Sequence, residues 1–319
     1  MNFNQIMEAA RQETLKHFGR VIQLYAPLYL SNECINSCAY CGFNRKSEIN
    51  RITLGLDQVL KEARFLKRQG FQHILLLTGE DRKSASVDYL AKIVKAVKEL
   101  FVSVSIEVYP LSEDEYKTLI DAGVDGLTIY QETYHRPTYK RVHPSGPKKD
   151  YDWRWGAPER AARAGMRKIG IGFLLGLYDW KYEAAALAEH LQFLLKKYWQ
   201  TQFQVSFPRL NPAETKFKIE YPVSDQDFIQ LLCAFRLRFP QIGFTLSTRE
   251  RAGFRDKIFP FGITQMSAGS KTYPGAYALG IRSGKQFEIA DRRSPREVAR
   301  ALVKAGYEPV WKDWERVLA

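Results

Sequence analysis

The stretch Ser31-Asn-Glu-Cys-Ile-Asn-Ser-Cys-Ala-Tyr-Cys-Gly-Phe43 decides how the rest of the chain is interpreted. It places Cys34, Cys38 and Cys41 at a C-x3-C-x2-C spacing, directly after an apolar run at residues 21–30 that is typical of a β-strand. The short gaps let three thiolates turn inward from one loop onto one inorganic centre. Because thiolates select zinc or iron–sulfur clusters, the stretch predicts one of these two centres.

The number of nearby ligands favours the cluster over zinc. A closed zinc site or an electron-carrying cluster takes four protein ligands. Cys233 is far away within an apolar helical pattern, which favours a buried thiol acting as a small hydrophobe. His73 and His135 stay open as distant fourth ligands, although no motif pairs them with the loop. Three thiolates and a vacancy fit a four-iron cluster with one iron open to a small molecule, and a zinc loop is the alternative.

The cysteine spacing, with Tyr40 just before the last cysteine and a strand just upstream, resembles the signature of radical S-adenosylmethionine (SAM) enzymes. The resemblance implies a [4Fe-4S] cluster held by Cys34, Cys38 and Cys41, with its open iron chelated by the amino and carboxylate groups of SAM. It also implies that the reduced cluster cleaves SAM to a 5′-deoxyadenosyl radical, which abstracts hydrogen from the substrate.

Composition and charge set the broad class of the protein. The chain has 319 residues, is 45% hydrophobic and carries a formal charge of +13. Its Lys and Arg residues are scattered among acids, as on solvated helix faces, so we expect no nucleic-acid partner. Four cysteines do not make a disulfide framework, and no signal peptide or membrane span of roughly 20 apolar residues is evident. We therefore expect a cytoplasmic protein with no membrane partner.

An alternation of strands and helices predicts an α/β fold of the (βα)8 TIM-barrel type. A short amphipathic helix is expected at residues 2–18, and helical patterns lie at 56–66 and 228–235. The expected strands lie at residues 21–30, 73–78, 102–108, 126–131, 168–175, 203–210, 243–249 and 264–270. The predicted division is an N-terminal helix at 1–20 and one barrel domain at 21–319. An open six-unit barrel is the alternative, because the last two units are the shorter ones.

Active sites of such barrels lie at the C-terminal ends of the strands, where several polar groups are found. Gly79 lets the backbone approach a ligand, and a buried Glu107 needs a partner, either a ligand group or a neighbouring Arg. The basic run at residues 136–149 is expected to be a mobile surface loop. In the resembled enzymes these strand-end positions serve SAM, with the backbone at Gly79 near its amino group and Arg154 near its carboxylate. The resulting set of SAM-binding candidates is Tyr40, Gly79, Glu80, Glu107, Tyr130, Glu132, Arg154 and Leu210.

Arginines and hydroxyls after the last three strands suit an amino-acid substrate. Arg249 is expected to hold the substrate carboxylate, with Ser267 and Ser270 as neighbours and Arg209 as a further candidate. The alternative is a set of interior arginines paired with acids such as Glu250.

Taken in order, these motifs resemble the radical SAM aromatic amino-acid lyases, closest to the tyrosine lyases of thiamine biosynthesis, the 2-iminoacetate synthases. The matching stretches lie at residues 28–43, 78–80, 130–135, 205–210, 247–250, 270–272 and 309–314. The resemblance implies cleavage of the Cα–Cβ bond of L-tyrosine to 2-iminoacetate and p-cresol, with SAM cleaved to 5′-deoxyadenosine and methionine. It also implies a low-potential electron donor, and a thiazole synthase is a candidate recipient of the imine.

Three alternatives stay open. A tryptophan lyase of the same branch would act on L-tryptophan, and a SAM-binding relative without turnover would act as a binding partner. From a different class, a zinc-stabilised basic protein would bind nucleic acid. The resembled enzymes usually carry more helices before the barrel, and the hydrogenase-maturation relative adds a C-terminal cysteine motif. Because no cysteine follows Cys233, no second cluster is expected.

Overall fold

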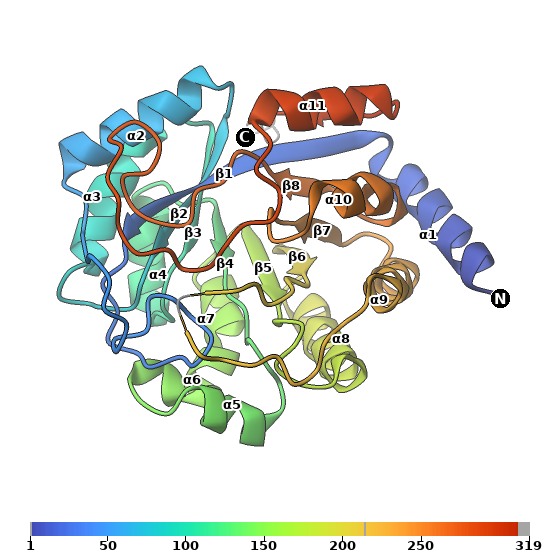
Figure 1. Cartoon of the computed structure of the whole chain (residues 1–319), viewed down its shortest axis with the longest axis horizontal. Helices are drawn as coiled ribbons and strands as arrows, with labels where there is room; N and C mark the ends of the chain where they lie inside the picture. The colour runs from blue at the N-terminus through green and yellow to red at the C-terminus, as the bar shows by residue number, and fades with distance from the viewer. Residues whose placement is uncertain (1, 214, 312–319) are drawn as a thin grey trace.

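The first strand closes the sheet into a barrel because it pairs with both the second and the eighth strand (Figure 1). The computed structural model describes residues 2–213 and 215–311. The barrel strands are β1 (Val21–Ser31), β2 (His73–Thr78), β3 (Ser103–Glu107), β4 (Gly126–Thr128), β5 (Lys168–Gly172), β6 (Gln202–Ser206), β7 (Gly243–Leu246) and β8 (Gln265–Ser267). All adjacent pairs are parallel. The predicted (βα)8 barrel is confirmed, and the open six-unit alternative is wrong.

One strand of the sheet, β9 (Glu308–Val310), was not predicted from the sequence. It pairs in parallel with the start of β1, where Val21 lies opposite Glu308. The expected motif at 309–314 continues past this strand, and its residues 312–314 lie outside the described residues. The division into a helix at 1–20 and one barrel domain at 21–319 stays a prediction.

Helices surround the barrel, as the alternating pattern predicted (Figure 1). They are α1 (Phe3–Phe18), α2 (Leu56–Arg68), α3 (Val87–Lys98), α4 (Glu113–Asp121), α5 (Arg136–Val142), α6 (Tyr151–Trp155), α7 (Ala157–Arg163), α8 (Trp180–Lys197), α9 (Asp225–Arg238), α10 (Ala252–Ile258) and α11 (Pro295–Lys304), with short 3-10 turns η1 (Pro147–Lys149) and η2 (Phe259–Phe261). The predicted N-terminal helix is α1, which begins with an Asn2 capping box and packs against α9. None of the helices in the described part of the chain combines the length and hydrophobicity that a membrane span requires.

The two-residue period of a strand divides its side chains between the helix layer and the barrel interior. On β2, Ile74 and Leu76 are fully buried against the helices. Leu75 and Leu77 point the other way and pack with Tyr29. The strands therefore carry an apolar core outside the barrel and leave their inner positions to line the mouth.

The segment at residues 136–149 was predicted to be a mobile surface loop, and this prediction is wrong. It forms α5 and η1 and packs on the cysteine loop, where Ser37 N donates to Ser145 O over 3.1 Å and Ala39 N donates to Val142 O over 2.9 Å. Apolar and hydroxyl side chains at helical spacing within the basic run are buried, which fixes one face of α5. The many basic residues in this run led to its interpretation as a loop, although the helical spacing was present.

Candidate active site

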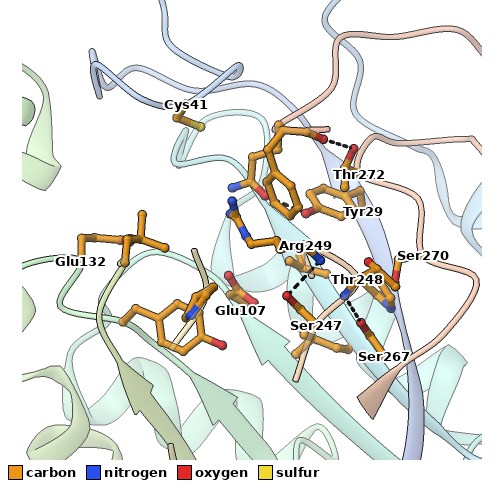
Figure 2. A pocket seen from close by; sticks show the side chains of 18 of the residues that line it. Tyr29, Cys41, Glu107, Glu132, Ser247, Thr248, Arg249, Ser267, Ser270 and Thr272 are labelled. Carbon is orange, nitrogen blue, oxygen red and sulfur yellow. Dashed lines mark hydrogen bonds between the residues drawn. The ribbon is translucent and has the colours of Figure 1, made fainter. Parts of the chain in front are cut away.

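Two adjoining cavities lie at the C-terminal end of the barrel. The cysteine cavity, of about 90 Å³, is lined by all three loop cysteines. The inner cavity, of about 110 Å³, lies deeper and includes Arg249, Ser267 and Ser270 in its lining (Figure 2). Seven residues line both cavities: Tyr29, Cys41, Leu77, Glu107, Glu132, Lys148 and Gln286. A molecule bound in the cysteine cavity would therefore face a molecule bound in the inner one.

The cysteine loop is held by close backbone packing. Its neighbour Gly79 has no room for a side chain, because a Cβ there would collide with the Glu33 carbonyl group. Asn44 Nδ2 donates to Cys38 O over 2.9 Å, and Asn36 Nδ2 donates to the Glu80 carboxylate over 2.6 Å. Glu80 thus braces the loop from the end of β2.

The three thiols fit a cluster better than one zinc ion. Cys34, Cys38 and Cys41 form no disulfide and line one cavity. Burial raises the pKa of Cys41 to about 11 and that of Cys38 further, so binding iron would displace their protons. Within residues 2–213 and 215–311, no group of three or more His, Cys, Asp or Glu side chains is gathered to hold a metal ion. A zinc site draws all ligands to about 2.0–2.3 Å from one ion, whereas a four-iron cluster spreads its thiolates over separate irons.

The two candidate histidines do not approach this loop as a fourth ligand. His73 is buried inside the barrel, where its Nε2 lies 2.9 Å from Ser105 Oγ. His135 Nδ1 lies 2.9 Å from Thr138 Oγ1, and its ring stacks on Tyr178 with centroids 3.7 Å apart. Neither residue lines the cysteine cavity.

Glu132 lines both cavities and pairs with two cationic side chains. Its backbone has a φ of 72°, a left-handed conformation that few non-glycine residues adopt and that is often found at functional sites. Lys148 Nζ lies 2.5 Å and Arg154 Nη2 3.1 Å from its Oε1 atom. Burial alone would raise the pKa of Glu132, but these two cations hold it below the ordinary value. Arg154 also donates from Nε to Tyr130 O over 2.7 Å.

The side chains of Arg249 and Glu107 face the inner cavity and have no hydrogen-bonding partner within residues 2–213 and 215–311 (Figure 2). The guanidinium of Arg249 lies over the Phe287 ring, 3.3 Å from its centroid, and no acceptor among the described residues pairs with it. Burial lowers its pKa. Burial also raises the pKa of Glu107 to about 7, and the charge of Glu132 adds to this effect. An arginine that lines a cavity without an acceptor in the described part of the chain, beside a carboxyl group, is suited to bind the carboxylate and the amine of an amino acid.

The remaining predicted substrate residues differ in whether their side chains already have hydrogen-bonding or ion-pair partners within the protein. Ser267 Oγ accepts a hydrogen bond from Thr248 N over 3.0 Å, whereas Ser270 Oγ has no partner within the described part of the chain. Arg209 does not line either cavity, because its guanidinium pairs with Glu250 and Asp225. The role predicted for Arg209 is therefore the one for which this geometry offers no support.

Most predicted SAM-binding residues lie at the cavities. Gly79, Glu80 and Arg154 line the cysteine cavity, and Tyr40 and Tyr130 line the inner one. Leu210 lines neither cavity and belongs to an apolar cluster that includes Cys38 and Tyr40. All of these roles stay predictions.

The lining residues that were missed from the sequence include Lys148, Gln286 and Phe287. Gln286 closes the site from the segment after β8, accepting from Tyr29 OH over 2.6 Å and, through its carbonyl, from Gly42 N over 2.9 Å. A signal was present, because the segment after the eighth strand of a barrel must pass over its mouth.

Comparison with known proteins agrees with this geometry. The Radical SAM superfamily model matches residues 28–190, and the Biotin and Thiamin Synthesis associated domain matches residues 206–308. The chain is 44% identical to the 2-iminoacetate synthase of Escherichia coli over 98% of this chain and 84% of that protein. It is 42% identical to the Salmonella typhimurium 2-iminoacetate synthase, over 97% and 82% respectively.

A solved structure shows the same architecture. HydG, a maturase of the [FeFe]-hydrogenase, superposes with a TM-score of 0.93 at 37% identity, covering 97% of this chain and 69% of HydG. With a cysteine-lined cavity at the mouth of the same barrel, the chain belongs to the radical SAM superfamily and, within it, to the 2-iminoacetate synthase family.

Proposed function

We propose that this protein is a radical SAM lyase that cleaves the Cα–Cβ bond of L-tyrosine to give 2-iminoacetate and p-cresol, with SAM cleaved to 5′-deoxyadenosine and methionine. The observation that carries the proposal is Arg249, which has no acceptor among the described residues and lies in a cavity that adjoins the one lined by Cys34, Cys38 and Cys41. The similarity to two 2-iminoacetate synthases over nearly the whole chain supports the same reaction.

The chain uses a [4Fe-4S] cluster and SAM, as its family does. When bound, this pair supplies a 5′-deoxyadenosyl radical that takes a hydrogen atom from the amino group of the substrate. The three loop cysteines would hold the iron, and the backbone at Gly79 would contact the SAM amino group. Glu132 has one oxygen engaged by two cations, which leaves the other to accept from a ligand hydroxyl group.

The residues of the inner cavity would position the amino acid. Arg249 would clamp the carboxylate, with Ser270 Oγ free to add a hydrogen bond. Glu107 would accept from the substrate amine when ionised. Because Phe287 lies against the Arg249 guanidinium, the clamp is shielded from water and its orientation is fixed. The hard chemistry belongs to the cofactors, and the protein contributes position and the exclusion of water.

The proposal extends to the partners. A reductant is required to reduce the cluster, and we propose a low-potential electron-donor protein in the cytoplasm for this step. We also propose that a thiazole synthase takes up the imine, because a free imine hydrolyses in water.

Mass spectrometry of a reconstituted anaerobic reaction tests the function. With isotopically labelled L-tyrosine, SAM and a reductant, the expected products are labelled p-cresol and labelled glyoxylate from hydrolysis of the imine. A rearranged indole acid from L-tryptophan, without p-cresol from tyrosine, would assign the chain to tryptophan instead. Binding of SAM with no product from either amino acid would identify a relative without turnover.

A further inference from the structure

Lys148 reaches the cluster site from an unexpected part of the chain. It follows α5, and its backbone is fixed on both sides, since Lys148 N donates to Asn36 Oδ1 over 2.9 Å and Lys148 O accepts from Tyr139 OH over 2.6 Å. Asn36 lies between two of the cluster cysteines in the sequence. The cysteine loop therefore fixes the position of the Lys148 backbone.

The side chain of Lys148 points inward between the two cavities. It is only 15% exposed and lines both cavities together with Cys41. Its Nζ atom lies 5.9 Å from the centre of the Tyr40 ring, the residue immediately before Cys41. The next residue, Lys149, is exposed to solvent and lines neither cavity. Two adjacent lysines thus differ in whether their charge is buried at the cluster site or exposed to solvent.

The positive charge of the Lys148 ammonium group is not fully neutralised by its ion-pair partner. It shares one carboxylate oxygen of Glu132 with Arg154, so two cations face one anion. A charge in such a buried site is poorly screened by salt and acts strongly on its neighbours.

We propose that Lys148 is a positioning residue that sets the reduction potential of the cluster, by stabilising the extra negative charge that the reduced cluster carries. Reduction potentials of iron–sulfur clusters depend on nearby charge, hydrogen bonding and exposure to solvent. Removing this cation makes the cluster harder to reduce. The inference rests on the cluster of the proposed function but not on its substrate.

The test is a redox titration of the anaerobically reconstituted protein, followed by electron paramagnetic resonance, without SAM or tyrosine. Lys148→Met keeps the length and the apolar stem of the side chain but removes the charge. The expected result is a more negative midpoint potential, with the reduction equilibrium lowered about tenfold, which corresponds to about 59 mV for one electron. Lys148→Arg should retain the wild-type potential, and Lys149→Met is the matched control with no expected change.

A double-mutant cycle with Glu132→Gln separates direct action from neutralisation of the glutamate. If Lys148 acts on the cluster, Lys148→Met lowers the potential in the Glu132→Gln background as well. A shift that disappears in that background, or a Lys148→Met potential equal to wild type at equal iron and sulfide content, overturns the inference. Since the titration contains no amino acid, its result does not depend on tyrosine cleavage.

Discussion

Two arginines from neighbouring strand ends lie in opposite environments. Arg209, after β6, is bound to Glu250 and Asp225 outside the cavities. Arg249, after β7, enters the inner cavity with no acceptor for its guanidinium among the described residues (Figure 2). Arg249 and Glu250 are neighbours in the turn after β7, where Arg249 lines the inner cavity and Glu250 pairs with Arg209.

The difference separates a structural ion-pair network from a binding site. In the first region every charge has a partner, and Glu250 is only 4% exposed. In the second region the carboxyl group of Glu107 and the guanidinium of Arg249 lie together without forming an ion pair. Groups whose burial is not compensated within the protein are the ones that a ligand can satisfy.

The largest expected effect is on the paired region. Arg209→Ala leaves the buried Glu250 without its partner, so the free energy of unfolding should fall by about 3–5 kcal/mol. Urea denaturation of the anaerobic apoprotein measures this change. An unfolding free energy within 1 kcal/mol of wild type, as is roughly the limit for exposed pairs, would show that the network is not structural.

The pH dependence of the unfolding free energy tests the environment of Glu107. Its pKa is raised to about 7, so between pH 4.5 and 7 the unfolded chain loses a proton that the folded chain keeps. The contribution of Glu107 to wild-type stability therefore falls as pH rises through this window. Glu107→Gln cannot ionise, so it should match wild type at low pH and exceed it above pH 7 by at most about 3 kcal/mol. Denaturation at both ends of the window measures the gap, with exposed Glu48→Gln as the control; a gap that is equal at both ends contradicts the assignment.

Arg249 should affect binding where Arg209 affects stability. Arg249→Ala removes a charge-assisted contact worth about 1.5–3 kcal/mol, so KM for tyrosine should rise about 10–150-fold. The unfolding free energy should fall less than in Arg209→Ala, because the contact with the Phe287 ring is lost but no ion pair is broken. Steady-state kinetics and denaturation of the same preparation check both statements, and wild-type KM in this variant would remove Arg249 from the substrate site.

A smaller effect is expected where the segment after α5 meets the cysteine loop. Gly146 and Gly165 have nearly the same φ, 92° and 93°, and Ala at either should cost about 1 kcal/mol. A Cβ at Gly146 would also collide with Asn36, including its Cα at 2.7 Å, whereas Gly165 has nothing within 4 Å. Gly146→Ala should therefore reduce the iron bound after reconstitution, and Gly165→Ala should not. Equal iron content in the two variants would show that this packing does not support the cluster.

The sequence was sufficient for the barrel, and for a set of cysteines that line one cavity, because both depend on local patterns. The eight strands follow from apolar runs and the cysteines from their spacing. Lys148 could not be placed, because its direction depends on a contact between Asn36 and a segment more than a hundred residues away. Nor could the sequence distinguish Arg209 from Arg249, since both follow strands and only the folded chain shows which one finds acids.

The most direct test of the account is the iron, sulfide and zinc content of anaerobically reconstituted protein, together with its electron paramagnetic resonance spectrum before and after addition of SAM. The account predicts a full [4Fe-4S] complement that is lost when Cys38 is replaced by Ala, and a reduced-cluster spectrum that changes when SAM binds the open iron. Bound zinc without iron, or a cluster whose spectrum ignores SAM, would contradict it.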